Sequence, residues 1–280
     1  SAGESERAGL VAKIRRAEVR VSLTDAFAKA HDTVKEFTEK QYLAALNPQK
    51  LNALACICGM HTRMGHTGIV FATHLLTAKV LRDVLGEGWE ILSGSNAHGV
   101  DEKHSAEANQ QIVKRFNAGE LAGIISTAVG ESSLDLYCTA FRYVVVLDAD
   151  GGSASAAQKL GRAARTPRVS GKEGESPERQ RERRLALQKS AAYYEINTRN
   201  TADMEAADRR TVEFAAEGYP KTTRIAYADL VAWADEEGFA LPHATLLRDM
   251  RLLKEIMTYD PLGQSMVRAK AVAVDVKAPQ

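Results

Sequence analysis

The chain has 280 residues, of which 45% are hydrophobic and 26% are charged, so it can bury at least one large core. Its formal net charge of +1 excludes a uniformly basic surface, and any contact with DNA must therefore be local. Three cysteines do not make a disulfide framework and indicate a reducing compartment, and no run of about 18 apolar residues is present that could span a membrane.

The N-terminal part of the chain predicts one strand followed by helices. Residues 1–8 are small and polar, and we expect them to be disordered or an artificial chain end. The stretch 10–21 alternates in part and is rich in valine, which is typical of a strand. Residues 25–46 carry apolar side chains at helical spacing and predict one long helix. Pro48 suits the first turn of a second helix that runs to about Met64.

The middle of the chain alternates between strand and helix patterns. Its short, continuous apolar runs are typical of strands that are buried on both faces. Strands that alternate with helices predict an α/β fold, with a mostly parallel sheet and helices on both faces. The predicted strands are 68–73, 89–94, 122–127 and 142–148, and the predicted helices are 74–85, 102–117 and 153–165.

The last part of the chain changes in composition. Residues 166–186 are rich in proline, glycine, serine and then charge, which predicts a surface loop that leads into a helix. Helical patterns continue from about 184 to 216. A final helical pair follows at 227–237 and 244–258, and the segment 267–280 is uninformative.

The strongest chemical signal is the octet QKLGRAAR, from Gln158 to Arg165. Arg162 and Arg165 are three residues apart and share a face of a helix that follows a strand. Arginine heads at the carboxyl edge of a parallel sheet are well placed for a phosphate ligand, as in an arginine finger. A surface helix with two solvated arginines explains the octet alone equally well.

A second signal is STAVGESSLDL, from Ser126 to Leu136. A strand ends here in hydroxyls and continues through a glycine loop to the carboxylate of Asp135. Such a loop can offer N–H groups and hydroxyls to a DNA phosphate, and the aspartate can reach a ribose or an arginine. Taken alone, a polar loop with a helix-capping aspartate is the more common interpretation.

The two motifs, in this order and one strand apart, resemble a known family. GIVFAT (68–73), TAVGESSLDL and QKLGRAAR look like motifs IV, V and VI of superfamily 2 helicases. Ser132-Ser133 ahead of the Leu-Asp pair is similar to the XPB-type DNA translocases of TFIIH. The flanks 9–21, 35–54 and 190–219 also resemble that family, the last one with a Tyr-x-Leu-like strand before a helix that ends in Gly-Tyr.

The resemblance implies a RecA-like helicase C-terminal lobe. It places a first strand and a helical segment at 9–66, the lobe itself at 67–219 and a helical extension at 220–280. Glu131 stands where the family has aspartate, the segment 168–186 looks like an insertion, and nothing beyond about residue 222 matches the family. A divergent member is therefore also possible.

The resemblance also assigns roles to individual residues. Arg162 and Arg165 would reach the γ-phosphate of ATP, and Gln158 would position the nucleotide or an arginine. Gly161 and Asp135 would belong to the nucleotide site, and Asp135 would contact the ribose or brace the arginines. The DNA-phosphate contacts would come from Thr73, Ser126, Thr127 and Gly130. The implied biology is nuclear DNA opening in nucleotide excision repair and transcription initiation, with TFIIH or repair-complex subunits as partners.

The parts that bind most of the nucleotide are missing from this sequence. No G-x-x-x-x-G-K-[ST] phosphate loop is present, so ATP with Mg²⁺ would be held mainly by an N-terminal RecA-like lobe that the chain lacks. The string Asp101-Glu102-Lys103-His104 resembles a DExH box, but it starts a predicted helix instead of ending a buried strand. We therefore expect the chain alone to be inactive as an ATPase.

Several features have simpler explanations than a second function. Cys56, Cys58, His61 and His66 lack the spacing of a zinc site, and we expect no metal. The final helical pair could be a helix-turn-helix with Arg248 and Arg251 facing DNA, but a hairpin docked on the lobe, or a partner-binding element, fits its long turn better.

Two other classes of function compete with the motor. A non-catalytic member of the family could serve as a protein-docking module, which the unmatched segment after residue 222 favours. A DNA-binding protein that acts through this segment is the third class. The near-neutral charge disfavours it, and steep salt dependence of DNA binding by the segment alone would support it.

Overall fold

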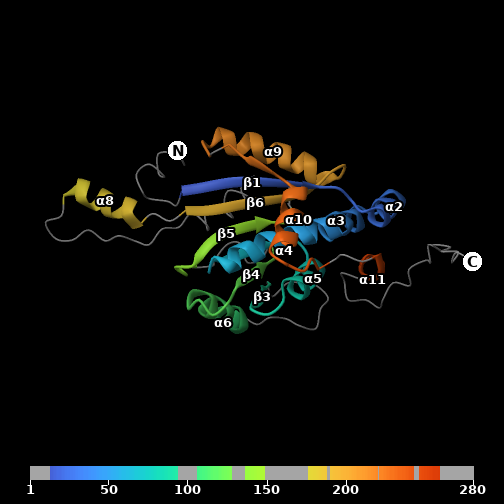
Figure 1. Cartoon of the computed structure of the whole chain (residues 1–280), viewed down its shortest axis with the longest axis horizontal. Coiled ribbons are helices and arrows are strands. Elements are labelled where there is room, and N and C mark those ends of the chain that lie inside the picture. The colour runs from blue at the N-terminus through green and yellow to red at the C-terminus, as the bar shows by residue number, and fades with distance from the viewer. Residues whose placement is uncertain are drawn as a thin grey trace, which may run out of the picture.

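The computed structural model describes residues 13–93, 106–127, 136–148, 176–187, 190–219, 221–242 and 246–258. Seven parallel strands form one sheet in the order β3-β4-β2-β5-β6-β1-β7 (Figure 1). The strands are β1 (Lys13–Val21), β2 (Thr67–Phe71), β3 (Trp89–Leu92), β4 (Gly123–Ser126), β5 (Phe141–Val146), β6 (Ser190–Thr198) and β7 (Thr223–Ala226). The helices are α2 (Asp25–Thr33), α3 (Phe37–Ala45), α4 (Pro48–Arg63), α5 (Leu75–Leu85), α6 (Ala106–Asn117), α8 (Pro177–Leu187), α9 (Ala202–Ala216), α10 (Tyr227–Glu236) and α11 (Leu246–Thr258).

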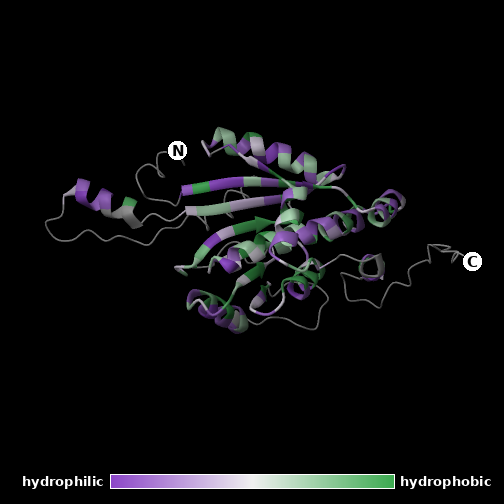
Figure 2. Ribbon diagram, viewed as in Figure 1, coloured by the Kyte–Doolittle hydropathy of each residue, from purple (hydrophilic) through white to green (hydrophobic). Residues whose placement is uncertain are grey.

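The centre of the sheet confirms the pattern predicted from the apolar runs. Every residue of β2 and of β4 is buried, as parallel strands covered on both faces require. Figure 2 shows β5 largely in the hydrophobic colour and α8 in the hydrophilic one. The α/β class with a parallel sheet is therefore set by the apolar runs themselves.

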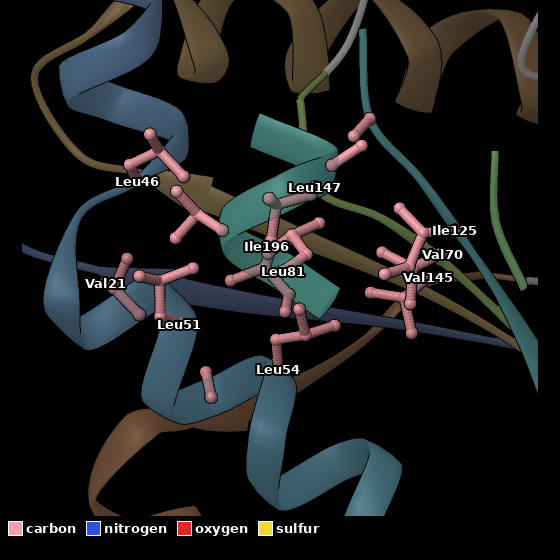
Figure 3. Packing of buried hydrophobic residues seen from close by; sticks show 14 of the residues in the cluster. Val21, Leu46, Leu51, Leu54, Val70, Leu81, Ile125, Val145, Leu147 and Ile196 are labelled. Atoms are coloured by element: carbon pink, nitrogen blue, oxygen red, sulfur yellow. The ribbon is translucent and has the colours of Figure 1, made fainter. Parts of the chain in front are cut away.

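Helices cover both faces of the sheet. On one face, α2, α4, α5, α10 and α11 contribute to a core with the strand residues Val21, Val70, Val145 and Ile196 (Figure 3). On the other face, Phe116 of α6 and Phe214 of α9 pack with the alternate residues of the same strands. Val19 and Val21 of β1 face the first core, whereas Ile14 faces the second, which is the alternation expected of a strand.

The helix predicted at 25–46 is wrong in its length. Two helices, α2 and α3, occupy this stretch, and Val34 between them is extended, with φ −73° and ψ 138°. The break lets Val34 turn into the core, where its side chain is buried, while α3 starts in a new direction. Apolar spacing continued across the break, so spacing alone predicted one helix.

The helical pattern predicted from 184 to 216 is also wrong for its first half. Residues 190–198 form β6, which lies between β5 and β1 in the sheet. Tyr193 and Ile196 face opposite cores, which a strand permits. The resemblance, which predicted a strand here, was therefore the better guide.

Two strands extend the sheet beyond the predicted lobe. β1 pairs with β6 along its whole length and with β7 at its carboxyl end. The lobe was expected to span residues 67–219. The sheet therefore also includes β1, which precedes this range, and β7, which follows it. β7 was not predicted, because its four residues are mostly exposed and lack an apolar pattern.

The two helices of the final pair dock on different parts of the lobe. α10 packs against α4, and the Cys56 thiol contacts the carbonyl oxygen of Leu230 at 3.5 Å. α11 packs instead against α2 and α3 through Leu252, Leu253 and Ile256. Both helices therefore dock on the lobe, but each of them packs against different helices. Within the described residues, no helix is long and apolar enough to cross a membrane.

Gly68 of β2 gives a first test of the fold, because a Cβ there would overlap the ring of its cross-strand partner Tyr143. We predict that Gly68→Ala lowers the free energy of unfolding by about 1–3 kcal/mol, the usual cost of overpacking. In a Tyr143→Val background the same change should cost less than about 1 kcal/mol, measured as a double-mutant cycle by urea unfolding. Equal costs in the two backgrounds would show that the ring is not the obstacle.

His61 ties α4 to the sheet through uncharged contacts. Its ring stacks on Tyr143 with centroids 4.0 Å apart, and its Nε2 lies 3.0 Å from the hydroxyl oxygen of Tyr194. Its Nδ1 lies 3.0 Å from Nδ1 of His66. Burial, together with the neighbouring His66, lowers the pKa of His61 to about 4, so the native state requires the neutral ring.

This lowered pKa predicts a loss of stability in acid. The unfolded chain binds a proton at His61 near pH 6.5 and the folded chain only near pH 4, so stability falls as the pH is lowered through this window. We predict that His61→Phe, which keeps a ring on Tyr143, reduces this fall by about 2 kcal/mol, measured by urea unfolding at each pH. An unchanged pH profile in the variant would contradict the assignment.

Candidate functional site

Three neighbouring strands of the sheet contain, or are followed in the sequence by, the segments that resemble the helicase motifs. β2, β4 and β5 are neighbours and run in the same direction, so all three end at the carboxyl edge of the sheet. The motif IV segment (68–73) contains most of β2, and in the sequence the motif V segment follows β4 and the motif VI segment follows β5. The edge of a parallel sheet is also where α/β proteins bind ligands.

The structure places only some of the predicted site residues. Thr73, Ser126 and Thr127 are described, at the ends of β2 and β4. Gly130, Asp135, Gln158, Gly161, Arg162 and Arg165 lie outside the described residues, as do Asp101 to His104 and residues 267–280. For Arg162 and Arg165, the structure therefore shows only the strand that precedes their segment, β5, which pairs with β2.

Thr73 is tied to the strand that leads into the motif VI segment. Its backbone N–H donates to Oδ1 of Asp148 at 2.7 Å. Asp148 follows β5 and is 9% exposed. The hydrogen bond holds the ends of β2 and β5 together and uses the Thr73 amide, so only the Thr73 hydroxyl is left to contact a phosphate.

Thr127 and Ser126 are held within the protein. The Thr127 N–H donates to the carbonyl oxygen of Leu92 at 3.1 Å, and the Ser126 hydroxyl donates to the Thr127 carbonyl oxygen at 3.3 Å. Both side chains are buried, and Ser126 is 0% exposed. A DNA phosphate could reach the Ser126 hydroxyl only if this segment opened, so its predicted DNA contact requires a local movement.

A buried lysine at this edge was missed by sequence reasoning. Lys50, in the first turn of α4, is fully buried, and its Nζ lies 2.6 Å from Oδ2 of Asp203. The same oxygen accepts the N–H of Thr198 at 2.9 Å, at the end of β6. One ion pair thus joins α4, β6 and α9. The only signal in the sequence was the Asn-Pro-x-Lys helix start, where a lysine is ordinarily solvated.

Lys50 also acts on the Asp148 carboxyl electrostatically. Burial raises the pKa of Asp148, and the positive charge of Lys50 and the Thr73 N–H partly offset this effect. The ammonium group is therefore ion-paired with Asp203, in the first turn of α9, and acts through its charge on Asp148, which follows β5. The buried Lys50 ammonium group therefore stabilises the carboxyl edge of the sheet and does not itself contact a ligand.

The cysteines and histidines of α4 form no metal site. Cys56 and Cys58 are buried, and burial raises the pKa of their thiols to about 11 and about 12, respectively. Within the described ranges, no group of three or more potential metal ligands comes together. These thiols are protonated at neutral pH and serve as small apolar side chains.

The ion pair predicts strong coupling between Lys50 and Asp203. Lys50→Met leaves a buried carboxylate without its partner, and we expect it to lower the free energy of unfolding by about 3–5 kcal/mol. Lys50→Met combined with Asp203→Asn should lose clearly less than the sum of the two single losses, measured as a double-mutant cycle by urea unfolding. Additive losses would show that the pair does not act as a unit.

Comparison with known proteins agrees with this geometry. A family model described as ERCC3/RAD25/XPB C-terminal helicase matches residues 5–275. The match includes the segment after residue 222, so the expectation that this segment has no counterpart in the family was wrong. No curated protein matches the chain in sequence.

Solved structures show the same fold at low identity. S. cerevisiae Dbp5 in complex with Gle1 and IP6 is 15% identical, with a TM-score of 0.51, over 86% of this chain and 46% of that one. The structure of T4 UvsW is 12% identical, with a TM-score of 0.50, over 78% of this chain and 42% of that one. The chain thus spans less than half of each of these proteins, and the shared part is a RecA-like helicase lobe.

The family model covers nearly the whole chain, and β4, β2 and β5, the strands associated with the three motifs, are neighbours in the sheet. The chain therefore belongs to the ERCC3/RAD25/XPB C-terminal helicase family.

Proposed function

We propose that the chain is the second motor lobe of an ATP-dependent DNA translocase of the XPB type. The observation that carries the proposal is that β4 and β5, which precede the motif V and VI segments, end at the same edge of the sheet. The motif V and VI segments leave the sheet on either side of β2, so a DNA contact and a nucleotide contact would belong to one rigid body. A change at the nucleotide would then move the DNA contact with it.

In this proposal each motif residue has a defined task. Arg162 and Arg165 neutralise the charge that develops on the γ-phosphate, with Gln158 and Gly161 beside them. Asp135 contacts the ribose or braces the arginines. The Thr73 hydroxyl, with Gly130 and, after local opening, Ser126 and Thr127, holds phosphates of one DNA strand.

The remaining parts come from a second RecA-like lobe. The sequence has no phosphate loop, so ATP and Mg²⁺ are held mainly by that lobe, and the chain alone does not hydrolyse ATP. By family membership we place the enzyme in the nucleus, in nucleotide excision repair and transcription initiation, with TFIIH or repair-complex subunits as partners.

The test is DNA-stimulated ATPase activity of the two-lobed enzyme that carries this lobe. We predict that Arg165→Ala lowers kcat by about a thousandfold or more, as expected for a lost arginine finger. Arg209→Ala, which removes an exposed arginine from α9, is the matched control and should retain full activity.

The outcomes separate the motor from a docking platform. Activity within a few fold of the wild type in Arg165→Ala would remove the arginine-finger role. A two-lobed enzyme that is inactive despite an intact phosphate loop would instead identify the lobe as a non-catalytic platform for other subunits.

A further inference from the structure

A pocket lies at the same edge of the sheet, in the half that β6, β1 and β7 form. It has a volume of about 740 Å³ and opens where β6, β1 and β7 end. Its lining includes Arg20, Arg199, Arg224 and the first turn of α10. Pockets of this size are typical of sites for small organic ligands.

The topology of the sheet makes this a favourable position for a ligand. β6 leads into α9, whose Phe214 packs on one face, whereas β1 leads into α2, whose Phe27 packs on the other. Adjacent parallel strands whose helices go to opposite faces leave a crevice between them at the carboxyl edge. The pocket lies at this switch point, between the ends of β6 and β1.

The charges around the pocket favour an anion. Glu18 is nearly buried, and its Oε1 accepts hydrogen bonds from Nε of Arg20 at 2.8 Å and from Nδ2 of Asn197 at 3.0 Å. Its charge is therefore compensated within the protein. Nε of Arg224 lies 3.7 Å from Oε2 of Glu18, but the Arg224 side chain is 71% exposed. Arg199 is also exposed, so both guanidinium groups are accessible to a ligand.

The backbone fixes the rim of the pocket. The Arg199 N–H donates to the carbonyl oxygen of Val21 at 2.8 Å, and Asn200 follows it in the left-handed region with φ 59°. Asparagine tolerates this conformation better than most residues. The turn therefore places Arg199 beside the end of β1 before any ligand binds.

The first turn of α10 contributes backbone N–H donors to the same wall of the pocket. Ala226 is its N-cap and has no side chain that could accept a hydrogen bond from the first turn, which also contains the acid Asp229. The amides of a helix N-terminus favour a negative group. Tyr227 lies in the same wall, and its hydroxyl accepts a hydrogen bond from Asn52 at 3.2 Å, which holds the ring in place beside the cavity.

We propose that this pocket binds a phosphate group of a nucleotide-sized ligand. Arg199 and Arg224 would form charge-assisted hydrogen bonds with the phosphate oxygens, and the ring of Tyr227 offers an apolar surface to the rest of the ligand. The phosphate could belong to a free nucleotide or to a nucleic acid strand that follows the edge from β2. At a strand spacing of about 4.8 Å, the end of β1 is about 14 Å from the end of β2. The site does not depend on the motor activity.

The test is titration calorimetry of the whole chain with pyrophosphate and with AMP at low salt. The Arg199→Gln/Arg224→Gln double variant should bind pyrophosphate at least tenfold more weakly, because two charge-assisted hydrogen bonds are lost. Arg209→Gln removes the same kind of charge from an exposed position on α9 and should bind as the wild type does.

Two variants at the start of α10 separate binding from folding. Ala228 is exposed in the first turn, so Ala228→Glu places an acid where it stabilises the helix but repels phosphate. We expect unchanged or higher thermal stability with weaker pyrophosphate binding. Asp229→Asn removes an opposing charge from the lining and should bind more tightly.

A fluorescent oligothymidylate identifies the source of the phosphate. If the double variant weakens oligonucleotide binding and pyrophosphate competes with the oligonucleotide, the site belongs to a nucleic acid strand. If oligonucleotide binding is unaffected while AMP binding is lost, the ligand is a free nucleotide. The absence of pyrophosphate binding at millimolar concentration, or an equal loss in Arg209→Gln, would overturn the proposal.

Discussion

All seven strands of the sheet run in the same direction, and this constraint sends every segment that follows a strand out at the same edge. The motif IV, V and VI segments are far apart in the sequence, but β2, β4 and β5 bring their starting points together. The same constraint brings together the ends of β6, β1 and β7, which come directly after β5 in the strand order. One edge therefore holds both the candidate motor site and the arginine-lined pocket.

The edge is held together by buried polar groups as well as by apolar packing. Lys50 and Asp203 form an ion pair that joins α4, β6 and α9, and Asp148 links β5 to the Thr73 amide. Removing such charges from water is costly, so their contribution depends on each group keeping its partner. We infer that the main role of these buried charges is to fix the positions of the strand ends at the candidate site. Their contribution to the free energy of unfolding is secondary.

Much of the architecture could be predicted from the sequence, and the errors have physical causes. The strands at the centre of the sheet are continuous apolar runs, which few other structures accommodate. The break at Val34 was missed because apolar spacing continues across it. The strand β6 was assigned to a helix because its polar residues, such as Glu195 and Asn197, are buried beside Arg210 on the α9 face, where they interrupt an apolar pattern.

The sequence by itself determined the family, the α/β class and the order of the three motifs, because these depend on residue identity and on local spacing. Only the tertiary structure decided that β1 lies inside the sheet, that Lys50 is buried and paired with a residue 153 positions away, and that three arginines from separate strand ends share one pocket. These features depend on which distant segments become neighbours. Strand pairing sets that choice, and no local pattern in the chain records it.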